Sequence, residues 1–267
     1  MHLFPLVLQA VLVSLALSLP LAVKWQIELN KAAFGALLAG LVAAWVSAQL
    51  ATTNPLAVLL AQALASGGLL LGAALILFHR DPERVPPPEE GAVVAPADGR
   101  VLYVKTLSPE EVPTAYKQGF PFRLQELAGS GLLEGGGYLV GIGMNLLDVH
   151  VNRAPLKGEV VLSRLVPGAS LSLKLPEALA TNTRLTTVIK GEHLTAAVIQ
   201  ITSRLVRHIR PYVRAGDLVE CGQRIGMIRF GSQVDVLLLG RPGLTIECRP
   251  QQRVKAGESV IARHREA

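Results

Sequence analysis

Cysteine is scarce in this chain of 267 residues, with only Cys221 and Cys248. Two thiols so far apart form neither a disulfide framework nor the close pairing of a cysteine metal site. We expect both to be reduced thiols in the cytoplasm. Aromatic residues are also few, at 4%, although the formal net charge is +6. Because no nucleic-acid-binding motif accompanies the basic charge, we expect no nucleic-acid partner.

Charge is missing altogether from three long apolar runs, which cover residues 3–23, 32–50 and 56–78. Each run is near the roughly 20 residues that a helix needs to cross a bilayer. A cleaved signal peptide is disfavoured for the first run, because no Lys or Arg precedes it and no clear cleavage site follows. We therefore expect residues 1–80 to form a membrane anchor of three transmembrane helices. Two spans with a surface-lying first helix remain an alternative.

Basic residues next to the apolar runs predict the orientation of the anchor. Lys24 and Lys31 lie between the first two runs, the next connection has no charge, and Arg80 and Arg84 follow the third. By the positive-inside tendency, everything after residue 78 lies in the cytoplasm, at the face of the cell (inner) membrane. Further basic residues cluster at 204–214 and 249–265. They indicate either contact with anionic phospholipid or simply a solvated basic face.

The rest of the chain reads as a stiff linker followed by a β-rich domain. Three consecutive prolines, residues 86–88, exclude a helix in the linker, which we place at residues 81–90. Strand-like runs then recur at 93–94, 101–104, 138–144, 160–165, 184–189, 195–201 and 227–239. Residues 109–126 read as loop and short helix, and 176–180 and 203–207 as short helices. Residues 91–267 should therefore form one mainly β domain.

A short internal repeat refines the prediction of the β domain. Residues 213–219 and 254–260 each read as a strand, a Gly-acid turn and another strand. Such units recur in the flattened β-barrels of lipoyl and biotinyl carrier domains. We expect a lipoyl-like flattened β-barrel or sandwich with few short helices, preceded by the transmembrane α-helices.

Gly231-Ser232 is the pair of residues with the most distinctive possible reactivity. The serine hydroxyl can attack the carbonyl carbon of the preceding residue, and glycine tolerates the strained backbone that this approach requires. Such a serine needs a base, which in turn needs an orienting group. A Gly-Ser pair alone is far more typical of a turn or bulge.

His150 and Asp98 are the candidate partners of the serine. The alternation around Val149 and Val151 places Asp148, His150 and Asn152 on one face of a strand edge. Because histidine as a residue type is easily tuned near neutral pH, His150 is the candidate base, although a structural histidine is an alternative. Asp98 lies in an Asp-Gly pair, which also suits a plain hairpin turn. His193 and His208 are expected to face water.

Four segments, taken together and in order, resemble the phosphatidylserine decarboxylase family, in its short membrane-tethered, archaeal-type branch. They are Phe78-His79-Arg80-Asp81-Pro82-Glu83-Arg84, residues 94–101 around Asp98-Gly99, residues 148–155 around His150, and residues 222–235 around Gly231-Ser232. The set covers most of residues 78–240. Each segment alone is weak evidence for the resemblance, whereas all four in this order are specific to the family.

The resemblance implies a zymogen that cleaves itself between Gly231 and Ser232. It implies a β chain of residues 1–231 and an α chain of residues 232–267, with Ser232 converted to a pyruvoyl group and Asp98 and His150 assisting. The pyruvoyl group, with no metal and no pyridoxal phosphate, would form a Schiff base with phosphatidylserine and release phosphatidylethanolamine. The partners implied are the anionic phospholipid and the two chains of one precursor, and a homo-oligomer is left open.

Two positions depart from the pattern of the family's long members. Those members carry two histidines three residues apart, whereas here the second position is Arg153, which could bind a carboxylate or phosphate. His150 would then serve both cleavage and protonation. Gln233 replaces a serine or threonine after Ser232, and this change leaves the attacking atom intact. Asn182 and Arg184 lie in a segment similar to a substrate-side family segment.

One alternative function belongs to a different class. Membrane-fusion or adaptor proteins also join an N-terminal anchor to a lipoyl-like β-sandwich, without catalysis. They normally carry a long helical hairpin, and no apolar heptad tract appears here. A carrier domain is disfavoured as well, because the usual lysine tip is absent. Within the decarboxylase interpretation, a diacyl and an ether lipid remain equally suitable substrates.

Overall fold

The computed structural model describes residues 3–24, 27–50, 54–108, 136–169, 171–173, 175, 178–203, 208–228, 233–239 and 243–265. The chain divides into two compact units. The first comprises residues 1–80 with 145–147, and the second comprises residues 81–144 and 148–267.

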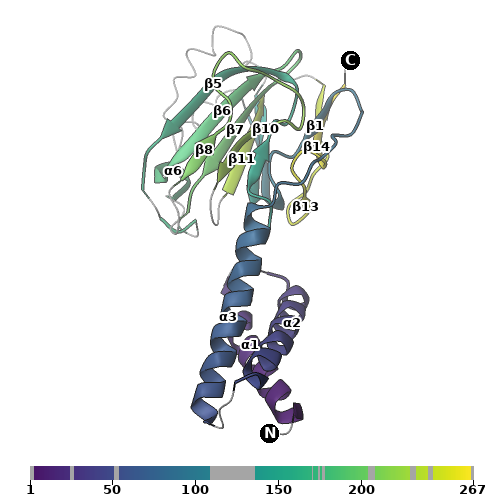
Figure 1. Ribbon diagram of the computed structural model, residues 1–267. Coiled ribbons are helices and arrows are strands. Elements are labelled where there is room, and N and C mark those ends of the chain that lie inside the picture. The colour runs from purple at the N-terminus through teal and green to yellow at the C-terminus, as the bar shows by residue number, and fades with distance from the viewer. Residues whose placement is uncertain are drawn as a thin grey trace. The chain divides into compact units, whose positions relative to one another are not determined.

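The first unit consists of three apolar helices (Figure 1), which are α1 (Leu3–Lys24), α2 (Leu29–Ala48) and α3 (Pro55–His79). Asn54 caps α3 by accepting hydrogen bonds from the N–H groups of Leu56 and Ala57, and Pro55 occupies the first turn, where its missing N–H costs nothing. All three helices are long and apolar enough to cross a membrane. Large apolar side chains point outward along them, as Phe4, Leu64 and Ile76 do, each at least 74% exposed. The predicted N-terminal helices are confirmed.

Small residues and one polar side chain bring these helices together. A Cβ on Gly40 would lie 2.7 Å from the Val11 Cα, so glycine is what allows α1 and α2 to approach this closely. Gln62 of α3 is fully buried and its Nε2 donates to the Leu6 carbonyl of α1 and to the Ser47 Oγ of α2, both at 3.3 Å. One amide group therefore connects all three helices.

The second unit is mainly β, as the sequence predicts. Its elements, in chain order, are β1 (Ala92–Val94), β2 (Gly99–Leu107), β3 (Gly137–Gly143), β4 (Val151–Arg153), β5 (Gly158–Val166), α6 (Ala178–Thr181), β6 (Arg184–Lys190), β7 (Thr195–Ile201), β8 (Ile209–Pro211), β9 (Leu218–Val219), β10 (Arg224–Ile228), β11 (Gln233–Leu239), β12 (Leu244–Ile246), β13 (Arg253–Val254) and β14 (Val260–His264).

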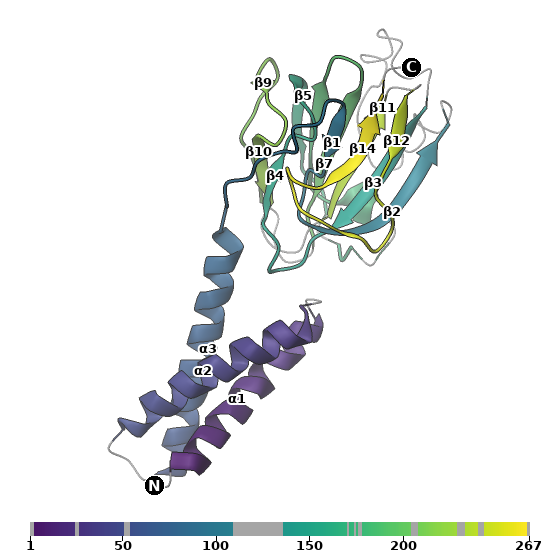
Figure 2. The ribbon, with the colours of Figure 1, turned by 90° about the vertical axis from the view of Figure 1, so that its right-hand side faces the viewer.

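These strands form three sheets. An eight-stranded sheet has the order β13-β2-β3-β11-β7-β6-β5-β9, and two three-stranded sheets have the orders β1-β14-β12 and β4-β10-β8. Every pairing between these strands is antiparallel, and Figures 1 and 2 show the large sheet curling around on itself. β-Bulges in β2 and β5 add to the curl, because a bulge increases the local twist.

The large sheet buries apolar side chains on both faces. Along β11, Val234, Val236 and Leu238 belong to the main core between the sheets. The alternating residues Leu237 and Leu239 pack in a second, smaller cluster with Val188, Ala197 and Leu107. A strand whose side chains are buried on both faces reads as a continuous apolar run, which is what residues 236–239 show.

The structure refines several of the predicted segments. The strand-like run 227–239 is two strands, because β10 ends at Ile228 and β11 begins at Gln233. A short helix lies at 178–181, close to the predicted 176–180. Both Gly-acid turns are present, with φ +92° at Gly216 and +74° at Gly257. Most of the predicted helix 203–207 and all of 109–126 lie outside the described residues.

The proline-rich segment has no helix or strand, and its first residues are bound to the β unit. Asp81 accepts hydrogen bonds from Arg153 (3.1 Å) and Arg224 (2.5 Å), and Glu83 accepts one from Arg224 (2.6 Å). These ion pairs attach the first residues of the expected linker directly to β4 and β10.

Candidate active site

The connection between β10 and β11 carries the Gly231-Ser232 pair. Residues 229–232 lie outside the described residues, whereas both flanking strands lie within them. Ile228 ends β10 opposite Ile209 of β8. Gln233 begins β11 in the middle of the large sheet, paired with Gly143 on one side and Ile201 on the other. The four-residue connection therefore starts and ends at fixed points.

His150 lies beside the start of this connection. Its backbone carbonyl accepts a hydrogen bond from the Ile228 N–H at 3.1 Å. The imidazole is fully buried, and its Nδ1 lies 2.7 Å from the carbonyl oxygen of Asp148. A carbonyl can only accept, so in the neutral ring Nδ1 carries the proton and Nε2 carries the lone pair. This is the tautomer that a base acting through Nε2 requires.

Asp98 acts on the backbone next to His150. Its carboxylate accepts hydrogen bonds from the Val149 N–H (3.3 Å) and the Ala256 N–H (2.8 Å). The sequence predicts that Asp98 and His150 belong to one site, and the structure places them in adjacent segments. The ring itself is oriented by the Asp148 carbonyl, so the contribution of Asp98 passes through the peptide of residue 149.

Arg84 completes the environment of Asp98, and sequence reasoning assigned it no role in the site. Its Nη1 and Nη2 donate to the two carboxylate oxygens of Asp98 at 2.5 and 2.9 Å, and Nη1 also donates to the Ala256 carbonyl. The hydrogen bond to Asp98 raises the pKa of Arg84. The sequence feature that could have indicated Arg84 is its position at the end of the Asp-Pro-Glu-Arg segment. No local pattern in the sequence, however, pairs residue 84 with residue 98.

Glycine at position 99 allows the turn that carries Asp98 to approach the end of β3 closely. Its φ is +152°, and a Cβ there would lie 2.3 Å from the carbonyl oxygen of Gly143. The Asp98-Gly99 turn is therefore also the close contact between β2 and the end of β3. Since Gly143 pairs with Gln233, the turn, β3 and the start of β11 are fixed together.

Arg153, the predicted carboxylate or phosphate ligand, is almost fully buried and holds other parts of the chain. Its guanidinium donates to the carbonyl oxygens of Gly222 and Pro82, both at 2.9 Å, and to Asp81. Burial lowers its pKa. The structure thus gives Arg153 a bridging position between the proline-rich segment and the turn before β10.

Asn182 and Arg184 lie at the start of β6. The Asn182 amide donates to the Leu171 and Thr202 carbonyls (2.9 and 2.8 Å) and accepts from the Leu171 N–H (2.7 Å). These three bonds fix the loop before β6. Arg184 is buried, which lowers its pKa, and it pairs with Ile201, the residue that also pairs with Gln233. Arg184 is therefore two strands from the start of β11.

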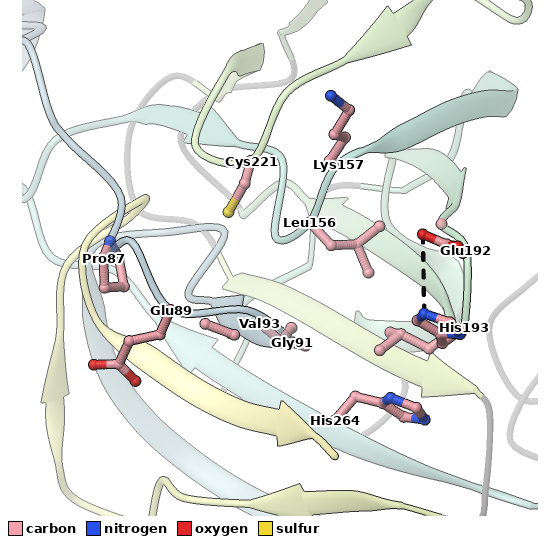
Figure 3. A pocket seen from close by; sticks show the side chains of 13 residues that line it. Pro87, Glu89, Gly91, Val93, Leu156, Lys157, Glu192, His193, Cys221 and His264 are labelled. Atoms are coloured by element: carbon pink, nitrogen blue, oxygen red, sulfur yellow. Dashed lines mark ion pairs between the residues drawn. The ribbon is translucent and has the colours of Figure 1, made fainter. Parts of the chain in front are cut away.

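A separate hollow of about 230 Å³ lies elsewhere on the β unit (Figure 3). His193 and His264 line it, with their rings stacked at a centroid distance of 5.3 Å. Glu192 is 3.9 Å from the His193 Nε2. The lining contains no residue of the segments 96–99, 148–150 or 228–233. His193 lines this hollow, and both His193 and His208 are exposed, as the sequence predicts.

The described part of the chain contains no group of three or more His, Cys, Asp or Glu side chains that could hold a metal ion. What the site offers is a buried imidazole with a fixed tautomer, a carboxylate that fixes the neighbouring backbone, and a strand connection that contains a hydroxyl. Such an arrangement suits proton transfer at a residue of the chain itself.

Fold and site together define a membrane-associated enzyme with a mainly β domain. The family described as phosphatidylserine decarboxylase matches residues 71–262, and the chain belongs to that family. It is 38% identical over 191 residues to a Methanothermobacter thermautotrophicus protein provisionally named archaetidylserine decarboxylase proenzyme, covering 72% of this chain and 81% of that one.

Bacterial relatives are equally similar. A phosphatidylserine decarboxylase proenzyme of Erythrobacter litoralis is 38% identical over 195 residues, which cover 72% of this chain and 74% of that protein. One of Symbiobacterium thermophilum is 37% identical over 203 residues, covering 74% and 84% respectively. The chain is thus a carboxy-lyase of phospholipid metabolism, in a family whose members are named as proenzymes.

Proposed function

We propose that this protein converts phosphatidylserine to phosphatidylethanolamine after cutting its own chain between Gly231 and Ser232. The observation that carries the proposal is the position of His150. Its backbone is hydrogen-bonded to Ile228, four residues before Ser232, and its ring has a defined tautomer. The family membership supports the decarboxylation, and the proenzyme names of the relatives support the cleavage.

In the proposed cleavage, the Ser232 hydroxyl attacks the Gly231 carbonyl carbon and His150 takes the hydroxyl proton at Nε2. The proton then passes to the Ser232 nitrogen as its bond to Gly231 breaks, and the peptide bond becomes an ester. Loss of the Ser232 Cα proton with cleavage of the Cβ–O bond releases a β chain of residues 1–231 that ends in a carboxylate. The remaining dehydroalanine takes up water and loses ammonia, which leaves a pyruvoyl group at the start of the α chain, residues 232–267. Asp98 holds the Val149 peptide and thereby the approach of His150.

The residues around position 232 fit such a prosthetic group. Residue 232 would be anchored only from its C-terminal side after cleavage, and that side is β11, paired along both edges. The ketone would supply an electron sink for loss of the substrate carboxylate. His150, buried and with its lone pair at Nε2, would take up a proton there and then donate that proton to the product carbon. Arg184 is the described buried cation nearest in register to Gln233, and we assign it to substrate binding.

Arg153 and Asn182 also have proposed places in this function. The contacts of Arg153 favour a positioning role, in which it holds residues 81–82 against the Gly222 turn before β10. The bonds of Asn182 favour holding the loop before Arg184. Both would support the binding site rather than contact the head group directly.

The membrane unit has a proposed role in substrate access. We assign residues 1–80 to the anchor, 81–90 to the connecting segment and 91–267 to the catalytic domain, on the cytoplasmic side of the cell membrane. A lipid substrate stays in the bilayer, so tethering keeps the enzyme at its substrate. The basic residues at the ends of the helices support this orientation.

Intact mass under denaturing conditions tests the cleavage. We expect two fragments, the smaller matching residues 232–267 and blocked to Edman degradation. The variant Ser232→Ala should stay whole, and His150→Ala should cleave far more slowly. A fully matured wild-type chain that stays whole, with no carbonyl that borohydride or hydrazine can trap, would overturn the proposal.

The lipid backbone of the substrate requires a separate measurement. The proposed chemistry touches only the serine head group, and relatives with both diacyl and archaeal-type names match this chain. We propose the diacyl lipid as substrate. Decarboxylation of an ether-linked serine phospholipid at a kcat/KM more than tenfold higher would contradict that choice.

A further inference from the structure

Three polar side chains form a closed hydrogen-bonded group directly beyond the proposed cleavage site. Gln233 Nε2 donates to the Tyr103 Oη at 2.9 Å and to the Asp235 Oδ1 at 2.7 Å. The Tyr103 hydroxyl donates to the Asp235 Oδ2 at 2.8 Å. We call these residues the Tyr-Gln-Asp network. It joins β2 to β11 although β3 lies between them.

The sheet is shaped to allow this contact. Tyr103 and Asp235 both pair with Gly141, so the three residues form one row across the sheet. A Cβ on Gly141 would lie 2.4 Å from the Tyr103 Cζ, so only glycine lets the ring lie across β3. The bulge between Val101 and Tyr103 sets the register, because without it residue 102 would take this place in the row.

The network holds β11 from the face opposite the main core. Val234 and Val236 point into the main core, so their neighbours Gln233 and Asp235 point to the other face. Gln233 and Asp235 are only 4% and 3% exposed. A buried carboxylate is costly unless it is hydrogen-bonded, and both of its oxygens are bonded here. Such a group has a defined geometry and little freedom to move.

Cleavage would make this support more important. In the precursor, residue 232 is held by the chain on both sides. In the cleaved enzyme it is a chain end, attached only to Gln233, and chain ends are mobile unless bound to the rest of the fold. Gln233 is fixed through its backbone to β3 and β7, and through its side chain to Tyr103 and Asp235.

We propose that Tyr103, Gln233 and Asp235 are positioning residues that hold residue 232 in place, first for self-cleavage and then as the reactive chain end. This inference rests on the proposed function. It assigns no contact with substrate to the network. Its effect is exerted through the peptide that joins residues 232 and 233, so its loss should impair the chemical steps more than lipid binding.

Near-isosteric variants in the full-length protein test the inference. Tyr103→Phe removes the hydroxyl, Gln233→Met removes the amide, and Asp235→Asn removes the charge. We expect each to lengthen the half-time of self-cleavage. In the cleaved fraction we expect kcat to fall by about tenfold or more with KM within about twofold, because small misplacements of a reacting group have effects of this size. Tyr212→Phe, at an exposed tyrosine, and Asp217→Asn, at a half-buried aspartate in the turn before β9, serve as matched controls.

The outcomes separate this inference from the proposed function. If the wild-type chain itself does not cleave, both fall. If the wild type cleaves and all three variants match it in cleavage rate and kcat, the network has no positioning role and only this inference falls. A rise in KM at unchanged kcat also overturns it, since that would indicate lipid binding. Melting curves identify a misfolded variant, and the two remaining substitutions then decide.

Discussion

The carboxyl group of Asp235 is buried, and burial raises its pKa from the usual 3.8 to about 6 even though Gln233 and Tyr103 donate to it. The folded state therefore binds this proton more tightly than the unfolded state does. The corresponding stability is fully present below about pH 3.8 and is lost as the pH rises through about 6. A difference of about two pH units corresponds to on the order of 3 kcal/mol.

Asp235→Asn should remove that pH dependence. We expect the variant to be about as stable as the wild type near pH 4 and more stable by roughly 1–3 kcal/mol at pH 7, since the amide carries no charge to bury. Urea unfolding at pH 4.5, 5.5 and 7 measures the difference between the two proteins. A constant difference across this range would contradict the prediction.

Asp98 presents the opposite case, because its charge is compensated. Asp98→Asn leaves the Arg84 guanidinium, whose side chain is only 5% exposed, without its hydrogen-bonded counter-charge and with Glu258 as an ion-pair partner at 4.0 Å. Breaking a buried pair on one side costs about 3 kcal/mol. We expect a clear fall in melting temperature, and a smaller loss in the double variant with Arg84→Met. Equal losses in the single and double variants would show that the two side chains are not coupled.

A candidate site residue can be predicted from the sequence only when the pattern that indicates it lies in a short segment around it. Asp98, His150 and Gly231-Ser232 stand out because each lies in a short segment with its own pattern. Arg84 and Tyr103 were missed because their partners, Asp98 and Asp235, are 14 and 132 residues away. Only the folded sheet brings them together, and no spacing rule in one sequence encodes that contact.

At the scale of elements, length and hydropathy predicted the helices well, since a bilayer imposes both. The start of α2, at Leu29 rather than at residue 32, differs because Asn30 and Lys31 are polar but still helical. Strands were predicted where β-branched residues concentrate. The ends of the two strands within 227–239 were not, because Gly231-Ser232 is the one turn signal there and it does not define where β10 ends or β11 begins.

Gln62 provides a test of the helical unit. Gln62→Leu removes the amide that bonds to α1 and α2, and in a membrane such a bond contributes about 0.5–2 kcal/mol. We expect the variant to unfold at a lower mole fraction of dodecyl sulfate in mixed micelles. The exposed Gln49→Leu is the control, and an unchanged midpoint for Gln62→Leu would show that helix packing alone holds the unit.

At the scale of the whole molecule, the two compact units predict separable roles. A chain of residues 81–267 keeps Asp81, Glu83 and Arg84, which bind the β unit. We expect it to fold and to cleave itself at close to the wild-type rate. On dispersed short-chain phosphatidylserine it should remain active, whereas on vesicles it should lose activity by about tenfold or more, because the effective concentration from tethering is gone.

The control for this prediction is the same β unit joined to an unrelated transmembrane helix. Recovery on vesicles would show that anchoring alone is required. If the truncated chain cleaves normally but is inactive on both forms of the lipid, the helices contribute to catalysis itself, and the separation of roles is wrong.

The strands that follow the proposed cleavage site are distributed through the molecule. β11 lies between β3 and β7, β13 pairs with β2, and β14 pairs with β1. A cut at residue 231 would leave two polypeptides that share one fold, because only the sheet β4-β10-β8 lies within a single one of them and the other two sheets contain strands of both. Maturation would then be a one-way step for the cell: an enzyme molecule that unfolds afterwards must find its own lost fragment by diffusion, so damaged enzyme is replaced by new synthesis rather than repaired.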